Sequence, residues 1–304
     1  MNKISIIIPT YRREMILVNT ITQLLGVNHT AHEILVVDQS ELHLDKTITN
    51  LSNLENKHAI SWIKLVKPSI PNAMNVGALK ATGDILLFLD DDIEVTSELV
   101  NEHSIEYLDS NVHAVAGKVV QLWQKDIKST ISSYRENQTQ NPDAFQFNSS
   151  IRIPVKRFMG GNVSFRKSSF LSVGGFDNNF TKVAYRFEAE FAERFLASGY
   201  NIVFNPEASI LHLKEETGGT RTFGDHRKTI RPSHSVGRYY YMLVVANQPQ
   251  RWLNFITSPF KSCLTKFHLS HPWWIPVTLI AEFSGMVWAI FLSIKGQQLI
   301  THRQ

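Results

Sequence analysis

The chain of 304 residues is 43% hydrophobic, which is enough to bury the core of one large domain or of a domain with an appendage. Its formal net charge is only +4, and no block of Lys and Arg stands out, which argues against nucleic acid as a partner. Cys263 is the single cysteine, which excludes an intrachain disulfide and a cysteine-based zinc site and favours a reducing compartment.

The first 120 residues alternate strand-like and helix-like patterns. Short apolar runs predict strands buried on both faces of a sheet, and apolar stripes at helical spacing predict helices between them. The strands are expected at 4–8, 33–37, 61–66, 84–89 and 113–120, and the helices at 14–25, 71–83 and 97–108. We therefore predict an α/β fold with a mostly parallel, Rossmann-like sheet flanked by helices. Such sheets bind ligands at the carboxyl ends of their strands.

Three carboxylates, Asp90, Asp91 and Asp92, directly follow the apolar strand predicted at 84–89. Adjacent like charges repel one another, so this arrangement needs water or a cation to relieve it. Side chains alternate along an extended chain, and we expect Asp90 and Asp92 to face one way and Asp91 the other. A pair of oxygen ligands on one side suits Mg²⁺ or Mn²⁺.

The second half of the chain is less regular. The polar section 121–158 is interpreted as a surface loop, and the paired glycines that follow it permit tight turns or a close backbone approach. A helix is expected at about 186–198, strands at 201–204 and 208–213, and a mobile loop at 214–221.

Residues 231–304 are rich in aromatic side chains and predict a helical extension. The segment 271–294 is long and apolar enough to cross a bilayer, although Pro276 and Glu282 weaken that interpretation. An interfacial helix with tryptophan anchors and a buried helix of the soluble domain remain alternatives. We expect membrane contact without deciding between spanning and lying on the bilayer. The opening residues hold too short an apolar stretch for a signal peptide, so we expect the cytoplasmic face of the cell membrane.

Five segments, in order along residues 3–221, resemble the family-2 glycosyltransferases, which have the GT-A nucleotide-sugar-binding fold. The segments are SIIIPTYRR (5–13), EILVVDQS (33–40), NAMNVGALKATGDILLFLDDD (72–92), MGGNVSFRKSSFLSVGGFD (159–177) and FEAEFAERFLASGYNIVFNPEASILHL (187–213). The resemblance implies a glycosyltransferase domain over 1–230, with a nucleotide-binding half at about 1–120 and an acceptor half at about 121–230. Residues 231–304 would form the extension.

The resemblance also implies which residues contact the nucleotide-sugar donor. For Asp38, the alternative is a turn-forming aspartate, and Arg12 or Arg13 could either neighbour the phosphates or carry a solvated charge. The implied donor contacts are Pro9, Thr10, Tyr11, Asp38, Asn75, Asp90, Asp91 and Arg221.

The implied metal ligands are Asp92 and Asp90, with His212 as a third ligand in some relatives. An isolated histidine is as readily a packed residue. A bound divalent cation would neutralise the charge that grows on the diphosphate as the donor breaks. The loop that carries Arg221 could close over the diphosphate.

Gly160, Gly161 and Asn162 are implied to border the acceptor or the donor sugar. An inverting transfer also needs a base, and family members usually carry Glu-Asp on the helix predicted at 186–198. Here the matching pair is Phe187 and Glu188, which is a departure from the family.

Glu190 competes with Glu188 for the role of base. It lies four residues before Arg194, so a helical ion pair is its simplest explanation. Glu188 has no basic residue three or four positions after it, so it is the preferred base, with Glu190 as the alternative.

The sequence therefore predicts a metal-dependent, inverting glycosyltransferase that makes a polysaccharide or a lipid-linked glycan. One alternative is a catalytically degenerate subunit of the same fold that scaffolds a membrane synthesis complex, because the Glu-Asp pair is missing. Nucleotidyl transfer is a weaker alternative, because PTYRRE after the first strand has no glycine to cradle a triphosphate.

Overall fold

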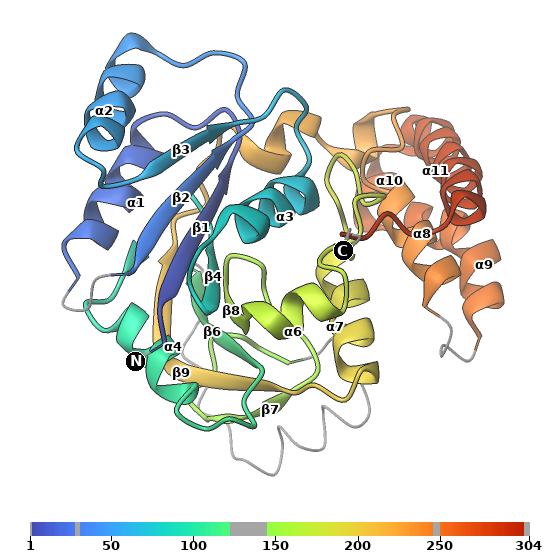
Figure 1. Cartoon of the computed structure of the whole chain (residues 1–304). Coiled ribbons are helices and arrows are strands. Elements are labelled where there is room, and N and C mark those ends of the chain that lie inside the picture. The colour runs from blue at the N-terminus through green and yellow to red at the C-terminus, as the bar shows by residue number, and fades with distance from the viewer. Residues whose placement is uncertain (1, 28–30, 122–144, 246–249, 301–304) are drawn as a thin grey trace.

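The computed structural model describes residues 2–27, 31–121, 145–245 and 250–300 (Figure 1). Most of the surface loop predicted at 121–158 lies outside these residues. The strands are β1 (Ile4–Thr10), β2 (Glu33–Asp38), β3 (Ser61–Lys64), β4 (Ile85–Leu89), β5 (Ile93–Val95), β6 (Ala114–Gln121), β7 (Ile153–Val155), β8 (Asn162–Arg166) and β9 (Ile202–His212).

All nine strands belong to one sheet in the order β3-β2-β1-β4-β8-β6-β9-β5, with β7 paired to β9. The predicted parallel arrangement is confirmed for β3-β2-β1-β4. Beyond β4 the sheet is mixed, because β8 runs antiparallel to both β4 and β6. The two strands predicted at 201–204 and 208–213 are one strand, β9, which pairs with β6 across an irregularity at Gly117–Lys118.

Helices cover both faces of the sheet. One face carries α1 (Met15–Leu25), α2 (Asp45–Asn56) and α4 (Leu99–Glu106), and the other carries α3 (Ile70–Lys80), α6 (Lys167–Ser172) and α7 (Phe187–Ala197). All four predicted helices of this domain are present, as α1, α3, α4 and α7.

Strand β4 is buried on both faces of the sheet, which explains its unbroken run of apolar residues. Its five side chains are all fully buried. Leu86 and Phe88 point into the core shared with α3, α6 and α7, whereas Ile85, Leu87 and Leu89 point into the core under α1 and α4. The residues that follow β4 therefore leave the sheet from its centre.

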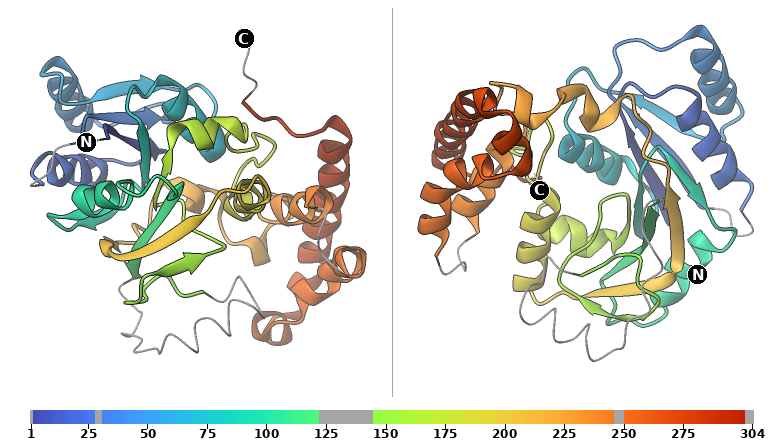
Figure 2. Two further views of the ribbon diagram at one scale, coloured as in Figure 1. Left: turned by 60° about the horizontal axis from the view of Figure 1, so that its bottom comes forward. Right: turned by 180° about the vertical axis from the view of Figure 1, so that it is seen from behind.

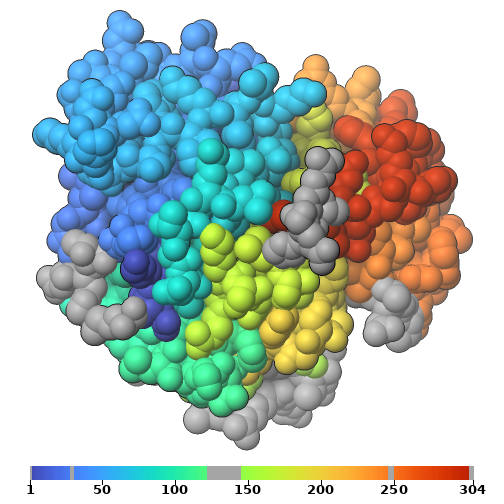
Figure 3. Space-filling view, viewed as in Figure 1, coloured from blue at the N-terminus to red at the C-terminus, as the bar shows by residue number. Residues whose placement is uncertain are grey.

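The predicted helical extension is confirmed. After two short 3-10 turns, η2 (Gly219–Phe223) and η3 (His226–Lys228), it consists of α8 (Val236–Val244), α9 (Arg251–Cys263), α10 (Lys266–Ser270), η4 (Pro272–Trp274) and α11 (Ile275–Lys295). These helices stand beside the sheet domain, with α8 packed on α7 (Figures 1 and 3). The division at residue 230 stays a prediction.

Gly77 lets α3 approach the sheet. A Cβ at this position would lie 2.4 Å from Cγ2 of Ile7 in β1. We expect Gly77→Ala to lower the free energy of unfolding by about 1–3 kcal/mol through overpacking, measured by urea denaturation. The control is Gly26→Ala, where the nearest atom would be 3.5 Å away and stability should change little. Equal stabilities of the two variants would contradict the close packing of α3.

Candidate active site

The candidate site lies over the carboxyl ends of β1 and β4. Strand β1 pairs with β2 on one side and with β4 on the other. The crossover connections therefore leave in two directions at this point, which is where open α/β sheets form a ligand crevice. The chain leaves β4 through Asp90, Asp91 and Asp92 and immediately enters β5.

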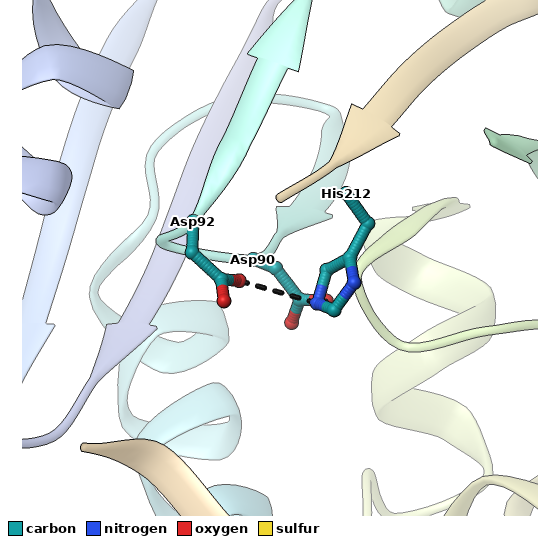
Figure 4. A group of neighbouring side chains, drawn as sticks. All are labelled: Asp90, Asp92 and His212. Atoms are coloured by element: carbon teal, nitrogen blue, oxygen red, sulfur yellow. Dashed lines mark ion pairs between the residues drawn. The ribbon is translucent and has the colours of Figure 1, made fainter. Parts of the chain in front are cut away.

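Asp90, Asp92 and His212 form a cluster whose potential ligand atoms all lie within 4.8 Å of one another (Figure 4). His212 Nε2 is 3.3 Å from Asp92 Oδ1 and 3.9 Å from Asp90 Oδ2. The antiparallel pairing of β5 with β9 places His212 opposite Ile93, beside the aspartates. Two carboxylates and one imidazole are a donor set that fits Mn²⁺. The three residues grouped by the sequence prediction are thus brought together.

Asp91 is not part of the cluster formed by Asp90, Asp92 and His212. Its carboxylate accepts hydrogen bonds from Thr10 Oγ1 at 2.7 Å and from Arg13 Nε at 3.1 Å. Arg13 also donates to Asp92 Oδ2 at 3.1 Å, and its side chain is 6% exposed. The repulsion within the triplet is therefore partly relieved by a buried arginine from the end of β1.

The charges within the cluster shift its pKa values. Burial, reinforced by the neighbouring charge of Asp92, raises the pKa of Asp90 to about 6. The hydrogen bond that His212 donates to the Asp92 carboxylate raises the pKa of His212 above its ordinary value. The Nδ1 atom of His212 is buried and has no hydrogen-bond partner among the described residues. A cation at Nε2 would compete with the proton there.

Two cavities meet at this cluster. The smaller, of about 210 Å³, is lined by Pro9, Thr10, Tyr11, Gln39, Asp90, Asp91, Asp92, His212 and Arg221, among others. The larger, of about 550 Å³, is lined by Gly160, Gly161 and Glu188, together with residues of the segment 183–189. Asp90 lines both cavities. The predicted donor contacts on β1 and the predicted acceptor glycines thus lie on adjoining walls.

The glycines of the larger cavity are needed for close approach. A Cβ on Gly161 would lie 1.9 Å from Asp90 Oδ2, and one on Gly160 would lie 2.8 Å from Glu188 Oε1. The backbone N–H of Gly160 donates to Glu188 Oε1 at 2.5 Å. The glycine pair therefore allows Asp90 and Glu188 to approach the same short stretch of backbone.

Glu188 and Glu190 occupy different environments. Glu188 is half-buried on the cavity wall, where burial and the nearby charge of Asp90 raise its pKa to about 7. Glu190 is 1% exposed and accepts hydrogen bonds from Arg194 Nε at 2.5 Å and from Gln297 Nε2 at 2.7 Å. The ion pair expected for Glu190 is present, so the geometry favours Glu188 as the base.

Two residues predicted as substrate contacts make buried hydrogen bonds within the protein. Asn75 is buried, donates to Phe176 O and accepts from Phe176 N–H, so it ties α3 to the turn after α6 instead of meeting a donor. Asn162 is fully buried and donates to Lys118 O and Ala208 O. Its amide fills the irregularity between β6 and β9, which leaves it no path to a sugar.

The expectation for Asp38 is not supported by the geometry either. Its carboxylate is buried and accepts hydrogen bonds from Ser40 N, His43 Nε2 and Trp62 Nε1, at 2.8, 2.7 and 3.0 Å. Gln39, the next residue, lines the smaller cavity. Asp38 therefore holds the end of β2 in place, and its neighbour reaches the cavity.

The loop predicted at 214–221 lies across the site. The backbone N–H of Gly219 donates to Tyr11 O at 2.8 Å, and that of Glu215 donates to Asp92 Oδ2 at 3.0 Å. A Cβ on Gly218 would lie 2.3 Å from Arg12 O. Arg221 Nη1 stands 3.9 Å from Asp92 Oδ2, on the wall of the smaller cavity.

Comparison with known proteins identifies this arrangement. The family model described as glycosyl transferase family 2 matches residues 5–174, more than half of the chain. The chain belongs to glycosyl transferase family 2. A further model, described as the N-terminal domain of galactosyltransferase, matches residues 144–217. The predicted family is confirmed, and the protein is a transferase.

Individual relatives of this glycosyltransferase are distant. Glucosyl-dolichyl phosphate glucuronosyltransferase of Haloferax volcanii is 24% identical over 220 residues, covering 69% of each chain. The mannosyltransferase PcManGT of Pyrobaculum calidifontis, solved with GDP-Man and Mn²⁺, has a TM-score of 0.56 at 18% identity, covering 97% of this chain and 79% of its own. GalNAc-T7, solved with UDP, GalNAc and Mn²⁺, has a TM-score of 0.59 at 11% identity, covering 86% and 55%. The structural similarities confirm the predicted GT-A fold.

The environment of Arg13 in this glycosyltransferase site was left open by the sequence. It was expected either near the phosphates or in solvent, and it forms buried ion pairs with Asp91 and Asp92. The sequence did indicate a buried ion pair, because a basic residue shortly after β1 lies at the same edge of the sheet as the acidic triplet after β4. Charge balance at that edge would have favoured a buried partner.

Proposed function

We propose that this glycosyltransferase moves a sugar from a nucleotide-sugar to a hydroxyl of a glycan or lipid-linked acceptor, with inversion and with a divalent cation. The observation that carries the proposal is the position of Asp90. Asp90 belongs to the acidic cluster and lines both cavities, and Glu188 lines the larger cavity. A donor in the smaller cavity and an acceptor in the larger one would meet there.

Asp90, Asp92 and His212 would hold Mn²⁺ or Mg²⁺, which when bound would offset the negative charge of the departing nucleoside diphosphate. The residues at the end of β1 and Gln39 would hold the nucleoside against the smaller cavity. Arg221, on the same wall, would pair with phosphate oxygens and help to exclude water.

Glu188 would act as the base. The acceptor oxygen attacks the anomeric carbon, the bond from that carbon to the phosphate oxygen breaks, and the acceptor proton passes to the Glu188 carboxylate. The hydrogen bond from Gly160 fixes one oxygen of Glu188 and leaves the other for the acceptor. A single displacement of this kind inverts the anomeric configuration.

The proposed acceptor is part of a polysaccharide or lipid-linked glycan pathway, with the protein at the cytoplasmic face of a membrane. Among the described residues, 272–295 form a helix long and apolar enough to cross a bilayer. The extension also reaches the larger cavity, because Arg186 on its wall stacks over the Tyr241 ring of α8 at 5.7 Å. A lipid-linked acceptor would bring the membrane and this cavity together.

The alternative is a degenerate subunit that scaffolds a membrane synthesis complex. The observation that favours it is the missing Glu-Asp pair, with Phe187 and Glu188 in its place. A carboxylate with a raised pKa on the wall of the larger cavity, Glu188, is the observation that weighs against it. Turnover of a nucleotide-sugar by the purified wild type, tested over a panel of UDP-, GDP- and dTDP-sugars with Mn²⁺, separates the two.

We expect Glu188→Gln to lower kcat for transfer by about 10²- to 10⁴-fold, because the amide cannot accept the acceptor proton. The matched control is Glu190→Gln, which weakens the ion pair with Arg194 and should lower the melting temperature while leaving kcat within a few-fold. Steady-state assays of nucleotide release and thermal unfolding give the two readouts. A fully active Glu188→Gln would overturn the assignment of the base.

The transfer reaction should depend on pH through Glu188. Its pKa is raised to about 7, and the base works only when ionised, so kcat/KM should fall about tenfold for each pH unit below 7 and level off above it. The pH profile of kcat/KM measures this. A profile that stays flat down to pH 5 would show that Glu188 is ionised throughout or takes no part.

Mn²⁺ should bind the chain through the Asp90, Asp92 and His212 cluster. We expect Asp92→Asn to weaken Mn²⁺ binding by about tenfold or more, because one anionic ligand becomes neutral. Calorimetric titration with Mn²⁺ measures this independently of activity. The control is Asp45→Asn on the exposed surface of α2, which should bind Mn²⁺ like the wild type. Equal affinities in all three proteins would place the metal elsewhere.

A further inference from the structure

Helices α9 and α11 lie beside each other on the outer side of the extension (Figure 2), and both expose large apolar side chains. The two exposed stripes adjoin, because the rings of Phe260 and Phe283 are 6.1 Å apart. We call this surface the apolar face and define it by Trp252, Ile256, Phe260, Phe283, Val287 and Phe291, each between 45% and 69% exposed. An exposed apolar surface of this extent marks an interaction site.

Helix α11 is apolar on two sides, and only one of them is buried. Thr278, Ala281, Gly285, Ala289 and Leu292 follow helical spacing and face the protein. A Cβ on Gly285 would lie 2.2 Å from Ser235 Oγ, so the helix packs closely on the start of α8. The high hydropathy of 272–295 therefore reflects two separate apolar stripes. One packs against the protein, and the other is exposed on its surface.

The one acidic residue of α11 faces inward. Glu282 is 7% exposed and accepts hydrogen bonds from Arg238 Nη2 and from the Tyr239 hydroxyl, both on α8. An α11 surrounded by lipid would have to break these contacts or carry α8 with it. Helix α8 has nine residues, about 14 Å, which is too short to cross a bilayer core of about 30 Å.

The start of α11 is held by η3, which follows the sheet domain, and the residues after its end are held by the sheet domain itself. Near its start, Thr278 Oγ1 donates to Arg227 O at 3.3 Å. Just after its end, Asn179 Nδ2 donates to Gly296 O at 2.7 Å, and Ile300 N–H donates to Gly174 O at 2.7 Å. A spanning helix leaves its two ends on opposite sides of the bilayer. Contacts that tie both ends of a helix about 32 Å long to η3 and to the sheet domain it follows would keep them on the same side.

The extension is basic. Residues 231–304 contain seven of the 31 Lys and Arg but only one of the 27 Asp and Glu, and that one is the buried Glu282. Cations stand beside the apolar face, with Arg251 over the Trp252 ring at 5.2 Å and Lys295 over the Phe291 ring at 4.8 Å. Lys261 and Lys266 are exposed nearby in the chain. Apolar side chains flanked by cations are suited to an anionic lipid surface.

We infer that the apolar face of α9 and α11 inserts into the interface of an anionic membrane, with α11 lying in the plane of the bilayer and not spanning it. The inference rests on the membrane contact proposed above and is independent of the chemistry of transfer. In this arrangement α11 lies flat on the membrane, although it is long enough to cross a bilayer. Its inner side packs against α8, next to the proposed acceptor cavity. The protein would then approach its acceptor from the membrane surface while its sheet domain stays in water.

The test compares Val287→Glu with Val66→Glu in the full chain. Both replace an exposed valine by a glutamate, at 69% and 92% exposure, but Val66 lies in the sheet domain. Flotation is measured with vesicles of phosphatidylcholine alone and with vesicles of equal parts phosphatidylcholine and phosphatidylglycerol. Wild type and Val66→Glu should float with the anionic vesicles and be released by high salt and alkali. Val287→Glu should bind roughly tenfold or more weakly, with an unchanged melting temperature.

Each other outcome overturns a distinct part. Wild type that resists alkaline extraction would show a spanning helix and reject the in-plane arrangement alone. Equal binding to neutral and anionic vesicles would reject the role of the cations. No vesicle binding, with a dimer in light scattering that Val287→Glu breaks, would assign the apolar face to a second copy. No vesicle binding by a monomer would reject membrane contact. Transfer to a soluble acceptor reports the proposed function separately and should be equal in all three proteins.

Discussion

The repulsion among three adjacent carboxylates at the end of a buried strand is the constraint around which this site is built. Strand β4 is fully buried on both faces, so the chain must leave it at the centre of the sheet. Alternation sends Asp91 to Thr10 and Arg13, and sends Asp90 and Asp92 toward His212. Arg13 thus offsets one of the three carboxylate charges within the protein, and Asp90 and Asp92 are left facing a crevice. A cation and an anionic donor would complete the neutralisation.

The same constraint reaches the loop and the acceptor wall. The loop at 214–221 is held over the site partly because Glu215 donates its backbone N–H to Asp92, while Arg13 spans both aspartates. On the other side, Gly161 brings β8 against Asp90 and Gly160 holds Glu188. The charge of Asp90 therefore helps to raise the pKa of Glu188. The two cavities are electrostatically coupled through Asp90.

The extension takes part in the same architecture. Helix α8 packs so closely on the sheet domain that a Cβ on Gly237 would lie 2.4 Å from Tyr185 O. Tyr185 and Arg186 line the larger cavity, and both have positions fixed by this helix. Helix α11 in turn supports α8 with one apolar stripe and exposes the other. Helices α8 and α11 thus lie between the larger cavity and the apolar face.

The sequence by itself determined the parallel strands of the first half, the family, and the grouping of the aspartate pair with the edge of β1, because these follow from periodicity, strand ends and motif order. It did not determine which polar side chains are used inside the protein. Asn75, Asn162 and Asp38 carry groups that suit a ligand equally well, and each instead forms hydrogen bonds with residues elsewhere in the fold. Only the tertiary structure supplies those partners, since a buried polar group must be satisfied wherever the chain places it. The same holds for α11, whose composition allows a spanning helix, but whose ends and buried Glu282 are held by one folded domain.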